Sequence, residues 1–157
     1  MRAEAVIERE MAVAGKPALP LRSVASTHHA PRAVYMNQES RELVVLLTRG
    51  ADHELSSVAF TIACGGITSG LKVCVFLTSA AVDLVRKRSV DLTQVPPLDP
   101  LKTLMEDFMK RGGTVIACPP CVKSRGYTQE DLIEGVTIAG ASAIHERFKA
   151  GAASLSF

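Results

Sequence analysis

The sequence has no tryptophan, few other aromatic residues and little net charge. It contains two tyrosines and five phenylalanines in 157 residues, and its formal charge at pH 7 is +2. A general nucleic-acid binder needs a concentrated basic surface, and a single-strand binder needs aromatic rings on which bases stack. Because both features are scarce, we expect no direct nucleic-acid partner.

The sequence also shows no apolar leader and no convincing membrane span. Residues 1–13 carry several charges, among them Arg2 and Glu10, which interrupt any signal-peptide core. The longest weakly charged stretch, 55–82, contains Gly65, Gly66 and Gly70, which favour a helix end and a turn. We therefore expect a cytoplasmic protein that does not associate with membranes.

Length and composition favour one soluble domain with a tail. Apolar residues make up 47% of the chain and charged residues 22%, which is ordinary for a globular protein. Residues 1–40 contain prolines and a Ser/Thr/His run but no sustained periodicity. The expectation is a flexible N-terminal extension over 1–40 and one folded domain over 41–157.

Five short apolar segments alternate with helical patterns from Glu42 onward. Runs of apolar and β-branched residues are typical of strands that are buried on both faces. The predicted strands are Leu43–Leu47, Lys72–Thr78, Thr114–Ala117, Val136–Ala139 and Ala153–Phe157. Strands that alternate with helices form right-handed crossovers. The sequence therefore predicts an α/β fold, a three-layer α/β/α arrangement around a mostly parallel five-stranded sheet.

The connecting segments carry helix patterns of different strength. The first helix is expected behind an Asp52 cap, with an inward face of Leu55, Val58, Ala59, Ile62 and Ala63. The clearest stripe follows an Asp99 cap and Pro100 at the first helical position, and consists of Leu101, Leu104, Met105, Phe108 and Met109. Shorter helices are predicted over Ala80–Arg88, over Gln129–Glu134 behind a Thr128 cap, and over Ala141–Ala150 with Ile144 and Phe148 inward.

Cys118 and Cys121 form the strongest candidate site. They follow a predicted buried strand in the segment Cys-Pro-Pro-Cys, so we expect them in a loop at the carboxyl edge of the sheet, where parallel sheets place their reactive groups. Lys123 and Arg125 are close in sequence, and positive charge favours the thiolate, the species that attacks sulfur. These cations are the predicted supports of the thiolate.

Three chemistries fit this cysteine pair: a dithiol/disulfide switch, half of a zinc site, or a persulfide that carries sulfur. A zinc site needs two more ligands, and Cys64 in a helix and Cys74 in a strand make a poor second pair. These two cysteines are better read as small core residues. No metal and no organic cofactor is predicted.

The segment from Leu43 to Phe157 resembles the DsrE/DsrF-like sulfur-relay family, including its TusD type. The shared features are LVVLLTRG, KVCVFLT, the MKRGG helix end, TVIAC leading to SRGY, and the closing LSF. In sulfurtransferase members a cysteine stands eight residues before the glycine of an Arg-Gly pair, as Cys118 stands before Gly126 here. The resemblance implies a DsrEFH-like fold with Cys118 as the sulfur acceptor.

What the resemblance implies about function is a sulfur-trafficking protein. It would accept sulfane sulfur as a persulfide on Cys118 and pass it to a partner thiol, within a homo- or hetero-oligomer, commonly a trimer or hexamer. Cys121 departs from the single-cysteine pattern, so storage, onward transfer and resolution as a disulfide all stay open. The alternative is a non-enzymatic binding or assembly module with a Cys118–Cys121 redox switch.

Overall fold

A computed structural model describes residues 41–157, which form one parallel sheet with helices on both sides. The strands are β1 (Glu42–Leu47), β2 (Lys72–Leu77), β3 (Thr114–Ala117), β4 (Val136–Ile138) and β5 (Ala153–Ser156). Their order in the sheet is β4-β3-β2-β1-β5, and every neighbouring pair is parallel. The predicted α/β fold is confirmed, and its sheet is parallel throughout. The predicted extension over 1–40 lies outside the described residues.

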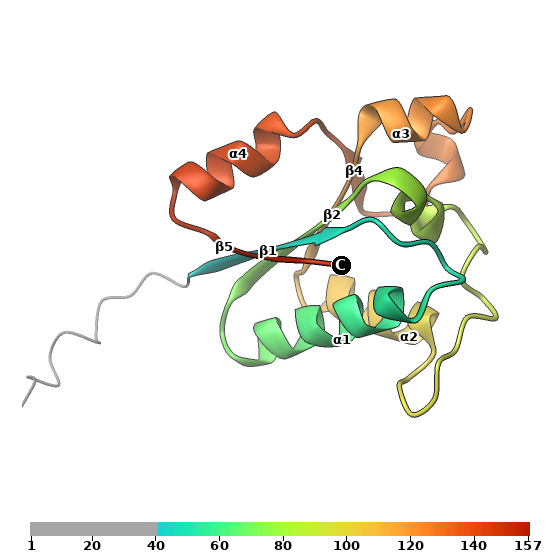
Figure 1. The fold of residues 1–157 in the computed structure, drawn as a ribbon, viewed down its shortest axis with the longest axis horizontal. Coiled ribbons are helices and arrows are strands. Elements are labelled where there is room, and N and C mark those ends of the chain that lie inside the picture. The colour runs from blue at the N-terminus through green and yellow to red at the C-terminus, as the bar shows by residue number, and fades with distance from the viewer. Residues whose placement is uncertain (1–40) are drawn as a thin grey trace, which may run out of the picture. The chain divides into compact units, whose positions relative to one another are not determined.

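Helices cover the two faces of the sheet unequally. The helices α1 (Glu54–Thr68) and α2 (Leu101–Lys110) lie together on one side, and α4 (Ser142–Lys149) lies on the other (Figure 1). The short α3 (Pro119–Ser124) directly follows β3, and its buried Val122 packs in the same cluster as α1 and α2. Two 3₁₀ segments, η2 (Ser79–Val85) and η3 (Gln129–Asp131), complete the described elements. The segments predicted as α-helices over 80–88 and 129–134 are therefore shorter and more tightly wound than expected.

The larger core lies between the sheet and the pair α1 and α2. The rings of Phe60 and Phe108 meet edge to face there, with centroids 5.8 Å apart, and both side chains are fully buried. The predicted stripe of α2 is confirmed, because Leu101, Leu104, Met105 and Phe108 are buried.

The predicted face of α1 is partly wrong. Its buried residues are Ser56, Ser57, Ala59, Phe60, Ala63 and Gly66. Ile62 is 37% exposed. Small residues let the helix approach the sheet closely: a Cβ at Gly66 would lie 2.9 Å from Val73 Cγ2. The buried side of α1 is therefore its small-residue side, with Phe60 as the one large side chain.

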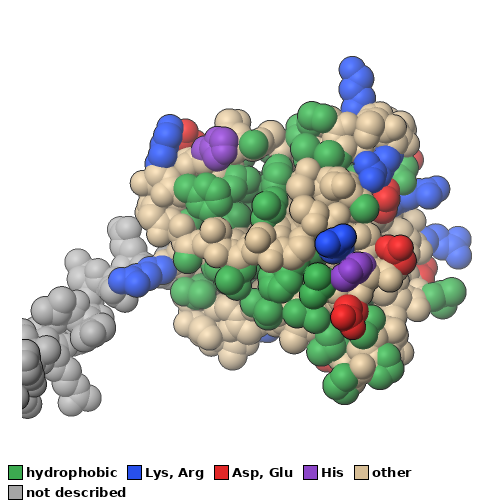
Figure 2. Space-filling view, in the orientation of Figure 1, with side chains coloured by type: hydrophobic (Ala, Val, Ile, Leu, Met, Phe, Trp, Pro, Cys, Tyr) green, Lys and Arg blue, Asp and Glu red, His purple; other side chains and the backbone are tan. Residues whose placement is uncertain are grey.

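The second face of the sheet carries a smaller cluster. It consists of Val44, Cys74, Phe76, Ile116 and Ile144. Ile144 comes from α4 and points inward as predicted, whereas Phe148 is 41% exposed, contrary to expectation. Hydrophobic side chains show at the surface both in the upper half of this view, which carries α4, and in the lower half, which carries α1 (Figure 2).

Two predicted helix caps are wrong, and one is confirmed. The cap of α1 is His53, not Asp52: its Nδ1 accepts the Leu55 N–H at 3.2 Å. Helix α2 begins at Leu101 with Pro100 in the cap position, so Asp99 lies one residue too early. Thr128 caps η3 as predicted, in a capping box with Asp131.

None of the helices within residues 41–157 is long and apolar enough to cross a membrane.

Candidate functional site

The cysteine pair lies at the carboxyl edge of the sheet, where β2 and β3 end side by side. Cys118 directly follows β3, and its N–H donates to the carbonyl of Leu77, the last residue of β2, at 2.9 Å. Cys121 lies in the first turn of α3. Both thiols are half-buried and free. The sheet and the helix thus bring together the two residues that the sequence analysis singled out.

The Cys-Pro-Pro-Cys segment begins a helix rather than forming the expected loop. Cys118 occupies the cap position, and Pro119 and Pro120 fill the first two helical positions. Those positions have no intrahelical acceptor for an N–H, so proline loses nothing there. The Val122 N–H donates to Cys118 O at 3.0 Å, and the buried Val122 side chain anchors the turn. Cys121 is therefore held by helical backbone.

The turn after β2 supplies the polar surroundings of Cys121. The Ser79 N–H donates to Cys121 Sγ at 3.2 Å, and Thr78 Oγ1 lies 3.4 Å from the same sulfur. The hydrogen bond with Thr78 lowers the pKa of the Cys121 thiol, and the Ser79 N–H, the Cys118 thiol and the Arg125 charge act in the same direction, against burial. The site therefore favours a thiolate on Cys121.

Ser79 has a backbone conformation that non-glycine residues rarely adopt. Its φ is +54°, in the left-handed region. Such conformations persist only where the surroundings enforce them, and they concentrate at functional sites. Sequence reasoning missed both Thr78 and Ser79. The available signal was their place directly after β2, at the sheet edge where Cys118 follows β3.

The two predicted cations differ in their relation to the thiols. Arg125 donates from Nη1 to the Cys121 carbonyl at 3.3 Å and pairs through Nε with Asp83 Oδ1 at 2.9 Å. Asp83 also accepts a hydrogen bond from the Tyr127 hydroxyl at 3.0 Å. Lys123 is exposed on α3, and within the described part of the chain its side chain makes no hydrogen bond or ion pair. Arg125 is thus the cation that is tied to the site.

The other two cysteines have raised pKa values. Burial raises the pKa of the Cys74 thiol in β2 to about 11. Burial also raises the pKa of Cys64, with nearby Asp107 adding to the shift, and its Sγ donates to Leu104 O at 3.5 Å. Among residues 41–157 no three His, Cys, Asp or Glu side chains are grouped as metal ligands would be.

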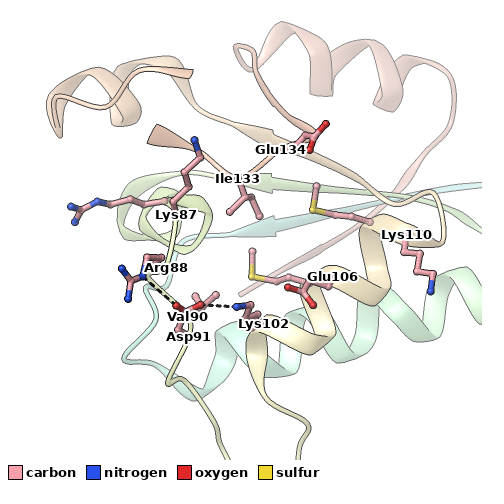
Figure 3. A pocket seen from close by; sticks show the side chains of 12 residues that line it. Lys87, Arg88, Val90, Asp91, Lys102, Glu106, Lys110, Ile133 and Glu134 are labelled. Carbon is pink, nitrogen blue, oxygen red and sulfur yellow. Dashed lines mark hydrogen bonds and ion pairs between the residues drawn. The ribbon is translucent and has the colours of Figure 1, made fainter. Parts of the chain in front are cut away.

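A separate cavity of about 660 Å³ lies between α2 and the segments 86–91 and 133–134. Its floor is apolar (Val90, Met105, Met109 and Ile133), and charged side chains stand around it. Lys102 and Arg88 both pair with Asp91 on its rim (Figure 3). One wall residue, Arg86, also lies over the Tyr127 ring, 5.5 Å from its centroid. Neither Cys118 nor Cys121 lines this cavity.

The fold and site together define an α/β protein with a dithiol at the carboxyl edge of a parallel sheet. The sequence profile of the DsrE/DsrF-like family matches residues 42–157, so the chain belongs to that family. Members of the family generally work in sulfur relay with partner proteins.

Individual proteins resemble the chain in sequence or in structure. An uncharacterised protein of Methanopyrus kandleri is 33% identical over 96 residues, which are 61% of this chain and 76% of that protein. The crystal structure of the YchN protein from E. coli matches with a TM-score of 0.61 at 20% identity, over 76% of this chain and all of that one. A protein of unknown function, MTH1491 from Methanobacterium thermoautotrophicum, matches with a TM-score of 0.60 at 17% identity, over 76% and 100%. These structural matches show the fold.

Proposed function

We propose that this protein carries sulfane sulfur as a persulfide on Cys118 and passes it to a thiol of a partner protein. The observation that carries the proposal is the half-buried Cys118–Cys121 pair at the sheet edge, with hydrogen-bond donors placed to stabilise a thiolate. Thiolate attack on a sulfur–sulfur bond needs no metal and no organic cofactor. Family membership supports sulfur as the atom that is transferred.

The direct test is the intact mass of the full chain after incubation with thiosulfate, polysulfide or glutathione persulfide. We expect a stable gain of one sulfur atom that is lost on reduction. The double variant Cys118→Ser/Cys121→Ser should gain none. The matched control Cys64→Ser should load like the wild type, because that thiol lies between α1 and α2. Equal loading of the double variant would contradict the proposal.

A second candidate is a binding or assembly module with a redox switch. It is favoured by one observation: both thiols are free and lie at the start of α3, Cys118 in its cap position and Cys121 in its first turn. Oxidation would then join them and remove two hydrogens without adding sulfur. A mass loss of two hydrogens, and no sulfur gain with any of the three donors, would favour this function.

The proposed partners are a protein that donates sulfur and a protein that accepts it. We propose that the chain acts as an oligomer, a trimer or hexamer. We also propose that it works in a reducing, cytoplasmic setting. All four cysteines are free thiols, as such a setting requires. The edge strand β5 and helix α4 expose Leu155 (43%) and Phe148 (41%), which a neighbouring subunit could cover. Sedimentation equilibrium of the wild type and of Leu155→Lys tests this: we expect the variant to dissociate.

A further inference from the structure

The two thiols of the site belong to different sides of the sheet. Cys121 packs against the larger cluster, between the sheet and the pair α1 and α2. Cys118 packs against the smaller cluster, which α4 covers only in part. One thiol is thus surrounded by donors from the turn after β2, and the other adjoins the more open face.

We propose that the two cysteines act in sequence: Cys121 receives the sulfur from the donor, and the sulfur then moves to Cys118, which holds it for the acceptor. This inference rests on the proposed function and divides it between two residues. Thr78 and Ser79 are the positioning residues of the first step.

Two contacts support Cys121 as the receiving thiol. The Ser79 N–H and the Thr78 hydroxyl approach its sulfur at 3.2 and 3.4 Å, and the strained φ of Ser79 orients that N–H. Together with Cys118 and Arg125 they lower the pKa of Cys121. Because only the thiolate attacks sulfur, these contacts raise the reactive fraction of Cys121 at neutral pH.

The first step takes sulfur from a donor persulfide, R–S–SH. The Cys121 thiolate attacks the outer sulfur, a Cys121 Sγ–S bond forms, and the donor's S–S bond breaks. The electron pair leaves on RS⁻, which takes the proton of the Cys118 thiol. Glutathione persulfide is a donor of this chemical class.

The second step moves the same sulfur across the pair. The Cys118 thiolate attacks the outer sulfur, a Cys118 Sγ–S bond forms, and the bond to Cys121 breaks. The electron pair returns to Cys121, where the donors of Thr78 and Ser79 again hold a thiolate. In sum, R–S–SH and the Cys118 thiol give RSH and the Cys118 persulfide, and no oxidant or reductant is consumed.

The direction of the transfer follows from the same contacts. A thiol whose thiolate is stabilised is the better leaving group in thiol exchange. Sulfur is therefore expected to leave Cys121 and stay on Cys118. There it lies beside the partly covered face, where an acceptor can reach it.

Time-resolved loading tests the order. The reduced full chain is mixed with glutathione persulfide, quenched at intervals with iodoacetamide, and digested with trypsin. Residues 112–123 form one peptide that contains both cysteines, and its fragmentation locates the sulfur. We expect the sulfur on Cys121 first and on Cys118 later. Label that appears first on Cys118 overturns the order.

Variants separate the two steps. Cys118→Ser should still gain sulfur and keep it on Cys121, because the second step has no thiol to receive it. Cys121→Ser should load at least about tenfold more slowly, because its remaining thiol lacks the two donors. Wild-type initial loading by Cys121→Ser overturns the receiving role. Hydrogen sulfide release with a Cys118–Cys121 disulfide, in place of a Cys118 persulfide, overturns the second step.

The role of Thr78 has a readout that needs no sulfur donor, the pH profile of Cys121 alkylation. Thr78→Val removes the hydroxyl at nearly constant volume and should move the midpoint to higher pH. Thr78→Ser should move it back toward the wild type, and Cys64→Ser serves as a distant control. An unchanged midpoint in a folded Thr78→Val variant overturns the positioning role. If the variant does not fold, the cysteine variants decide the order.

The two proposals fail in different ways. If no form of the protein gains sulfur, the proposed function is wrong, and a shifted alkylation midpoint would still identify Cys121 as the stabilised thiolate. If the wild type gains sulfur and Cys121→Ser gains it equally fast, the proposed function is supported, and the proposal that Cys121 receives the sulfur before Cys118 is wrong.

Discussion

Burial separates Cys74 from the thiols at the sheet edge. Cys74 lies in β2 with no exposed surface, and its pKa is raised to about 11 by loss of hydration. Cys121 has a lowered pKa because hydrogen bonds from the neighbouring turn oppose a smaller burial. The same side chain is therefore a core residue with a raised pKa in one place and a half-buried thiol with a lowered pKa in the other.

The raised pKa of Cys74 predicts a loss of stability at alkaline pH. The folded protein accommodates Cys74 only as the neutral thiol. The contribution of this thiol to the free energy of unfolding is therefore fully present below the ordinary pKa of 9.0, and it is lost as pH rises through about 11. The loss amounts to about 3 kcal/mol. Cys74→Ala removes the titrating thiol, so the variant does not undergo this loss. The difference in unfolding free energy between wild type and variant should therefore become smaller between pH 9.0 and about pH 11. Urea unfolding at several pH values measures this difference, and a constant difference would refute the prediction.

The residues of the site could be predicted only in part. The cysteines and Arg125 are visible in the sequence because their spacing after a buried strand is distinctive. Thr78, Ser79 and Asp83 are not, since their importance depends on the pairing of β2 with β3. That pairing brings residues about forty positions apart to one edge. Short-range sequence patterns hold no information on such contacts.

The adjacent glycines of α1, Gly65 and Gly66, allow a matched pair of substitutions that tests how closely this helix approaches the sheet. A Cβ at Gly65 would meet nothing within 4 Å, so Gly65→Ala should stabilise the protein by about 0.5–1 kcal/mol through higher helix propensity. At Gly66 the added atom would lie 2.9 Å from Val73 Cγ2 and 3.3 Å from Leu43 Cδ2. Gly66→Ala should destabilise by about 1–3 kcal/mol. Denaturant unfolding compares them, and equal effects would contradict the close helix–sheet approach.

A second pair of variants tests which helix faces carry the core. Phe108 of α2 is fully buried and meets Phe60 edge to face, so Phe108→Ala should cost about 3–5 kcal/mol. Phe148 of α4 is 41% exposed, and Phe148→Ala should cost about 1 kcal/mol or less. Urea midpoints give both values. A cost below about 1 kcal/mol for Phe108→Ala would show that α2 packs through another face.

Elements with a strongly periodic or continuous apolar pattern were predicted well from the sequence, whereas short elements such as α3 were not. The strands and the α2 stripe follow from runs of apolar residues and from i, i+3, i+4 spacing. Helix α3 was missed because two prolines suggest a loop, although proline is compatible with the first helical turn. The face of α1 was misjudged because close packing selects small residues. A hydrophobicity pattern favours Ile62 instead.

At the scale of the whole molecule, the described residues 41–157 hold a five-stranded sheet with two apolar clusters. The five strands pair with one another, and the clusters lie on the two faces of this sheet. The first described residues contact the rest of the domain: the Lys72 N–H donates to Arg41 O at 3.1 Å, and Arg147 pairs with Glu42. These contacts connect the start of β1 to β2 and to α4 within the described residues.

A chain that begins at Met36 should therefore fold and assemble like the full chain. We expect its melting temperature to lie within about 4 °C of the full-length value, since a shift of that size corresponds to about 1 kcal/mol in a domain of this length. Its mass by sedimentation and its loading by glutathione persulfide should be unchanged. Calorimetry and sedimentation of the two chains, at equal concentration, make the comparison. A large drop in melting temperature would assign residues 1–35 a structural role, and a change of mass alone would place them in the assembly of subunits.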